Sequence, residues 1–197
     1  MLASITPLGE RARKNSWWLT VSAYGLASTA GGATIGAVAG SVGLVVAALS
    51  PPAPGWRAGV GAAVCLLAAA ADLAGLSFGP HRQVDRRWLD RYRGWVYGGG
   101  FGFQLGLGVV TIVNSASVFA MLGLAVLLES PAAGAVAGAA FGLVRALPVL
   151  AFHGAGDFSR LQRAHQRLRS VTRASRIGTV VALGLATAVL AGTSLLA

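Results

Sequence analysis

Five long apolar stretches alternate with short polar segments along this chain of 197 residues. A helix needs about 20 apolar residues to cross the hydrocarbon core of a bilayer. The pattern therefore predicts an all-α fold, a polytopic membrane helical bundle that forms a single integral membrane domain over residues 1–197. The five expected transmembrane crossings cover about 17–49, 58–78, 95–128, 132–152 and 177–196.

Two of these stretches are too long for one simple crossing. Residues 17–49 and 95–128 would each form a straight helix of roughly 50 Å at 1.5 Å per residue. Helices of that length tilt, bend at defined residues or extend beyond the bilayer. We expect both to be kinked or broken, the first near Gly31–Gly32 and the second near Gly106–Gly108.

The same two stretches look like copies of each other. Tyr24-Gly25-Leu26 matches Phe101-Gly102-Phe103 at an offset of 77, and Ser50-Pro51 matches Ser130-Pro131 at an offset of 80. Chance similarity between segments rich in Gly, Ala and Val is the alternative. Repeats with interrupted helices are typical of transporters. The predicted internal repeat has its first copy at about 17–78, its second at about 95–152, and an extra C-terminal helix at about 177–196.

Charge sets the expected orientation. Only 11% of the residues are charged, against about 25% in soluble domains, which excludes a soluble globular enzyme. The net charge is +10, and the basic residues gather in 1–16, 79–94 and 153–176. Five crossings put all three segments on one side, which the positive-inside rule identifies as the cytoplasm. We therefore expect a multi-pass protein of the cell membrane, with its N-terminus cytoplasmic and its C-terminus outside.

The basic segments also indicate a partner. Apolar residues recur beside arginines within 82–93 and 160–173, as in helices that lie on a membrane surface. Such helices bind anionic headgroups. Because the charge sits between apolar runs, we expect the lipid bilayer, and no nucleic acid, as the partner of these segments.

Two ionisable residues fall within predicted spans at matching places in the two copies. Asp72 lies in the second stretch and Arg145 in the fourth, at similar depth. An intramembrane charge is expensive, so it is expected to be paired or hydrated. We hypothesise that Asp72 and Arg145 face each other across the repeat, either in a substrate path or as a structural ion pair. Snorkelling towards the cytoplasmic face is the further alternative.

The third stretch carries polar residues that include Gln104, Thr111 and Asn114. Thr111 and Asn114 are three residues apart, so they share a helical face. A polar face inside a membrane lines a solute path or makes hydrogen bonds between helices. Both interpretations stay open.

Glycines recur every four residues in three places. Such stripes let helix backbones approach closely, either within one bundle or in a homo-oligomer or with another membrane-protein partner. The three stripes are Gly32, Gly36 and Gly40; Gly98, Gly102 and Gly106; and Gly134, Gly138 and Gly142.

Catalytic signatures are missing from the sequence. It has no Walker A motif, no HExxH motif and no His/Cys cluster, and Cys65 is its only cysteine. No dithiol can form from one cysteine. We therefore expect no metal and no cofactor, and the chain is more consistent with a non-enzyme.

Residues 102–150 resemble the second half of the CcdA/DsbD-like membrane electron-transfer family. The resemblance implies a small helical bundle of a kind that can be adapted to transport. It does not extend to the redox cysteines, since Ile112 and its repeat counterpart Ile35 stand in their places. Thiol–disulfide transfer needs a dithiol. The resemblance rests on Gly102 to Gly108, Leu122 to Leu128, Phe141-Gly142-Leu143 and Ala146-Leu147-Pro148.

The sequence thus favours a transporter-like or permease-like protein that moves a small solute between the repeats. The residues expected to carry that role are Asp72, Arg145, Thr111, Asn114 and Gln104. The alternative is a non-catalytic subunit or scaffold of a larger membrane complex, which would pack through its glycine faces.

Overall fold

The structure is a computed structural model that describes residues 5–49, 56–74, 92–108, 117–153, 159, 162 and 177–188. These residues contain helices and no strand. Thr111 and Asn114 lie outside the described part, as do nearly all residues of the predicted interfacial segments. The elements are α1 (Pro7–Ala12), α2 (Trp17–Leu49), α3 (Trp56–Ala74), α5 (Gly94–Leu107), α6 (Ser117–Leu127), α7 (Pro131–Ala146) and η2 (Leu147–Phe152), followed by a helix at Ile177–Ala188.

Three helical segments are long and apolar enough to cross a membrane: Trp17–Leu49, Trp56–Ala74, and Pro131–Phe152, which joins α7 to η2. Large side chains such as Leu26 and Val136 are more than 70% exposed on their outer faces. Exposed apolar surface of this extent is unfavourable in water and favourable in lipid. The chain is therefore an all-helical membrane protein.

The long first stretch is one unbroken helix, so the break predicted near Gly31–Gly32 is wrong. α2 runs through both glycines, from Trp17 to Leu49. A Cβ atom on Gly31 would strike the carbonyl of Phe103, and one on Gly32 would strike the carbonyl of Gly138. These glycines serve close packing against two neighbouring helices, and that packing stabilises a continuous helix where isolated glycines would weaken it.

The second long stretch is divided where the sequence predicts it. α5 ends at Leu107, and Gly108 has a φ of 73°, in the left-handed region that glycine adopts without strain. The next described helix, α6, begins at Ser117. The side chain of Val118 lies against Gly108, so α6 begins close to the point where α5 ends.

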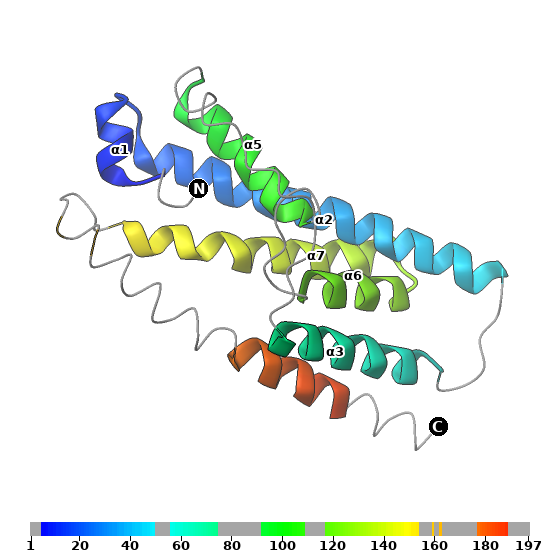
Figure 1. The fold of residues 1–197 in the computed structure, drawn as a ribbon. Coiled ribbons are helices and arrows are strands. Elements are labelled where there is room, and N and C mark those ends of the chain that lie inside the picture. The colour runs from blue at the N-terminus through cyan, green and yellow to red at the C-terminus, as the bar shows by residue number, and fades with distance from the viewer. Residues whose placement is uncertain are drawn as a thin grey trace.

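α2 is the central helix of the bundle (Figure 1). Its amino-terminal half packs on α5, with successive glycines of α5 meeting successive carbonyls of α2 in the same order. The two helices therefore run parallel. The contacts are Gly98 with Thr20, Gly102 with Tyr24, and Gly106 with Ser28.

α7 covers α2 along a longer track and in the opposite direction. Each glycine of the stripe in α2 faces a backbone carbonyl just before the start of α7 or within it, and each glycine of α7 faces a backbone carbonyl of α2. The Ser28 hydroxyl adds a buried hydrogen bond of 2.7 Å to the Gly142 carbonyl. All three glycine stripes are thus covered within one chain. The contacts are Gly32 with Gly138, Gly36 with Gly134, and Gly40 with Ser130.

The remaining helices form a second layer. α3 packs on α6, with Ala68 and Ala120 buried between them and Leu183 of the C-terminal helix against the pair. The Thr187 hydroxyl donates to the Ala62 carbonyl at 3.5 Å. Leu183 thus lies near Ala68, and Thr187 lies near Ala62, so the C-terminal helix runs antiparallel to α3. The two helices lie side by side in Figure 1.

We predict that Gly32→Ala destabilises the bundle and Gly25→Ala does not. The added methyl at 32 meets backbone that cannot move aside, which costs about 1–3 kcal/mol of unfolding free energy. Nothing lies within 4 Å of a Cβ at Gly25. Alanine there gains up to about 1 kcal/mol of helix propensity. Thermal unfolding of both variants in the same detergent is the measurement, and equal midpoints would contradict this packing.

Candidate functional site

Asp72 and Arg145 do not form the ion pair that the sequence suggests. Both are among the described residues, and no ion pair joins them there. Asp72 is 4% exposed near the end of α3, where it has a polar interaction of its own. Arg145 lies in the last turn of α7. Asp72 and Arg145 therefore do not neutralise each other, and each has its own surroundings in the bundle.

Arg145 is the most unusual group in the described part of the bundle. Its Nη1 atom is buried and has no hydrogen-bond partner. The guanidinium carbon lies 5.5 Å above the ring of Phe141, and Nη1 lies close to Gly108. A cation–π contact is worth about 0.5–2 kcal/mol, less than the roughly 2.5–3.5 kcal/mol that an arginine costs at a membrane midpoint. The contact with Phe141 alone does not compensate the charge.

Among the other residues of the predicted solute path, Gln104 lies in the described part of the chain, and no hydrogen bond there joins it to Arg145. Gln104 is half-buried on α5, three residues before its end. The described residues also contain no group of three or more His, Cys, Asp or Glu side chains that could hold a metal ion. The described part of the predicted path thus comprises a buried carboxylate, a half-buried arginine and one amide, with no contact joining the two charges.

A buried carboxylate that sequence reasoning missed lies at the amino-terminal end of the bundle. Glu10 of α1 is fully buried and accepts hydrogen bonds from the hydroxyls of Tyr97 and Thr20, the latter at 3.0 Å. Arg13 completes the group with an ion pair at 3.3 Å. A carboxylate held by three donors is stable when buried. The cluster joins α1, α2 and α5.

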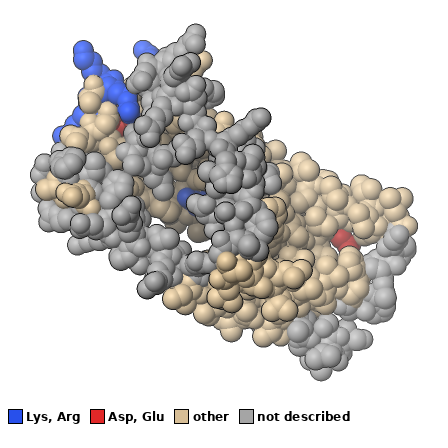
Figure 2. Space-filling view, viewed as in Figure 1, with Lys and Arg blue, Asp and Glu red and all other residues tan. Residues whose placement is uncertain are grey.

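The local sequence explains how Glu10 reaches this position. Thr6 caps α1, accepting from the Gly9 amide at 3.1 Å, and Pro7 follows at the first helical position. Ile5 is buried and its carbonyl accepts from the Trp17 indole at 3.4 Å. The available signal was that Glu10 is the only acidic residue before Asp72. Basic side chains gather over α1, as Figure 2 shows.

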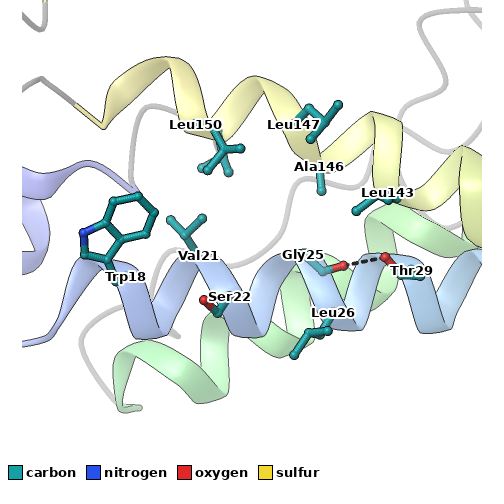
Figure 3. Close-up of a pocket in the computed structure, with 11 residues that line it drawn as sticks. Trp18, Val21, Ser22, Gly25, Leu26, Thr29, Leu143, Ala146, Leu147 and Leu150 are labelled. Carbon is teal, nitrogen blue, oxygen red and sulfur yellow. Dashed lines mark hydrogen bonds between the residues drawn. The ribbon is translucent and has the colours of Figure 1, made fainter.

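An apolar groove opens between α2 and the end of α7 (Figure 3). It has a volume of about 370 Å³. The helices touch through glycine up to Gly142. Beyond it the buried positions against α2 carry Ala146 and Val149 instead of glycine, and the half-exposed Leu143, Leu147 and Leu150 line the groove. Pro148 contributes to the opening of the groove, because α7 changes to a 3-10 helix at Leu147. Ser22 and Thr29 are the hydroxyl residues of the lining.

A larger cavity of about 780 Å³ follows α6. Its lining comes from α3, α6, α7 and Leu183, and extends from Ser117 to Leu128 along α6. Phe141 belongs to this wall. At the opposite end Arg57 is paired with Glu129. The cavity is therefore an elongated apolar space. The ion pair of Arg57 with Glu129 lies at one end, and Phe141, whose ring contacts Arg145, lies towards the other end.

One curated protein that resembles this chain is the methylamine utilization protein MauF of Paracoccus versutus. The two are 32% identical over 162 residues, which cover 75% of this chain and 55% of MauF. The chain spans about half the length of this relative. No family model matches the chain, and no solved structure matches it significantly. The similarity to MauF gives no indication of solute transport.

We predict that Glu10→Ala loosens α1. The Tyr97 hydroxyl loses its acceptor, at a cost of about 1–3 kcal/mol to the docked state. Trypsin should therefore cut at Arg11, Arg13 or Lys14 about fivefold faster or more. The control is Glu129→Ala, which removes an ion pair to the exposed Arg57 side chain, worth about 0–1 kcal/mol. Equal cleavage rates in the two variants would show that Glu10 does not hold α1.

Proposed function

We propose that this chain is an integral membrane protein that acts as a non-catalytic component in the utilization of a small amine. The observation that carries the proposal is the 32% identity to MauF, a methylamine utilization protein, over 162 residues. These residues make up three quarters of the chain, so the similarity extends well beyond any single apolar helix.

The packing supports a scaffold. α2 meets α5 and α7 through backbone atoms along most of its length, which fixes the three helices relative to one another. The outer faces carry large apolar side chains available to lipid or to another membrane protein. A rigid core with an apolar exterior suits the subunit or scaffold role that the sequence leaves as an alternative.

We further propose five crossings, with a cytoplasmic N-terminus. α2, α5 and the C-terminal helix run in one direction, while α3 and α7 run in the other. In the proposed topology the basic segments 1–16, 79–94 and 153–176 share one side, as the positive-inside rule requires. Reporter fusions after residues 78 and 197 test this arrangement; a cytoplasmic C-terminus would contradict it.

Movement of a small solute is the second candidate function, and Arg145 is the observation that favours it. A charge without a partner within a bundle is a common mark of a substrate path. The helix interruption at Gly108 lies beside this charge, which is the arrangement of many transporter sites.

The proposed role predicts that this chain can replace the aligned part of MauF. In Paracoccus versutus without MauF, we expect a chimaera that carries this chain in place of the aligned MauF segment to restore growth on methylamine. Intact MauF is the positive control, and membrane levels are matched by immunoblot. A chimaera present at the level of MauF that gives no growth would contradict the role in amine utilization.

The same strain separates the two candidates. If the chain acts as a scaffold, Arg145→Met in the chimaera should leave growth within about twofold of the unchanged chimaera. If it moves a solute past Arg145, growth should be lost while the protein remains in the membrane, because an intramembrane charge that binds substrate is rarely replaceable.

A further inference from the structure

Arg145 lies about two thirds of the way along an apolar segment. It is the fifteenth residue of the 22-residue segment Pro131–Phe152, so it lies about 21 Å from the start of that segment. A guanidinium stays protonated in proteins. Its charge therefore needs an anion, and no carboxylate of the described residues forms an ion pair with it.

The guanidinium is also held in place. Phe141 supports one face of it, and Nη1 lies beside Gly108. A positioned guanidinium with free N–H donors matches the two oxygens of a carboxylate.

The apolar cavity along α6 adjoins this group. Phe141 lines the cavity, and the guanidinium carbon of Arg145 lies 5.5 Å from the centre of its ring. The lining follows the 11-residue helix α6, so the cavity is about 16 Å long. Arg57, at the far end, is already neutralised by Glu129. An anion in this region is therefore drawn to Arg145.

We propose that Arg145 binds the head of a single-chain carboxylate whose apolar tail occupies the cavity between α3, α6 and α7. The cavity has an apolar lining suited to a hydrocarbon chain, and Arg145 provides the only unpaired cation that contacts its wall among the described residues. A free carboxylate, with one compact charged group, can enter beside Phe141. A phospholipid would have to draw its whole headgroup out of the interfacial layer, which is costly. This inference is independent of the role in amine utilization.

The test uses the purified full chain in nanodiscs of phosphatidylcholine. Dodecanoate is the probe, and dodecanol is the uncharged control; each is titrated by calorimetry and by the shift in thermal unfolding. We expect saturable binding of dodecanoate and binding of dodecanol at least about tenfold weaker, because dodecanol lacks the charge-assisted hydrogen bonds.

Three variants locate the site. Arg145→Met should weaken dodecanoate binding about tenfold or more, whereas Arg11→Met, the loss of an exposed arginine on α1 outside the cavity lining, should change it less than twofold. Ala137→Leu should narrow the cavity, weakening dodecanoate while leaving the unfolding temperature unchanged or higher. If Arg145→Met does not fold, Arg145→Lys replaces it, and we expect weaker dodecanoate binding because a lysine cannot make the paired hydrogen bonds of a guanidinium. Unchanged binding in both Arg145→Lys and Ala137→Leu would then overturn the proposal.

Equal affinities of dodecanoate and dodecanol would overturn the proposal, as would an Arg145 variant that binds like the parent chain. Complete displacement of dodecanoate by phosphatidylglycerol in the nanodisc would show that the site holds a phospholipid and would also overturn it. Loss of binding here with growth intact in the MauF chimaera would reject this site alone, leaving the proposed function in place.

Discussion

Backbone contact along α2 is the constraint on which the rest of the structure depends. Glycines place α5 on one side of this helix and α7 on the other, and a Cβ at nearly any of these contacts would strike a carbonyl oxygen. In lipid, moving an apolar side chain from the acyl chains to a helix interface releases little free energy. Close packing and buried hydrogen bonds therefore hold helices together. The Ser28 bond to the Gly142 carbonyl is one such hydrogen bond. It lies where α2, α5 and α7 all meet.

That contact also decides where cavities form. Where glycine faces glycine, no space remains between α2 and α7. Beyond Gly142 the buried positions carry Ala146 and Val149 instead of glycine, and the groove of Figure 3 opens there. The larger cavity lies in the second layer, where α3, α6 and α7 meet through larger side chains and no glycine pairs bring their backbones together. Both the groove and the larger cavity therefore lie at the periphery of the glycine-packed core.

The helical membrane fold and its close-packing faces could be predicted from apolar length and glycine spacing. The interruption at Gly108 was also predictable, but the same reasoning placed a false break at Gly31–Gly32. A glycine that permits a left-handed turn and one that accepts a neighbouring carbonyl look alike in sequence; only the packing partner distinguishes them. The Asp72–Arg145 pairing failed for a similar reason, since equal depth does not specify which face of a helix a side chain occupies. Glu10 escaped attention because its donors, Thr20 and Tyr97, come from two other helices.

The contrast between Glu10 and Arg145 indicates where function resides. Glu10 is buried at the end of the bundle with donors from three elements, so its charge is fully used in holding α1. Arg145 is deeper, and its buried Nη1 has no partner. A protein gains no stability from an uncompensated charge in a membrane, and an apolar residue of similar size would pack there at lower cost. The cost of keeping arginine is understandable if an anion that is not part of the bundle completes the site. The proposed carboxylate site lies in the cavity beside α6, apart from the rigid core around α2 on which the proposed scaffold role is argued.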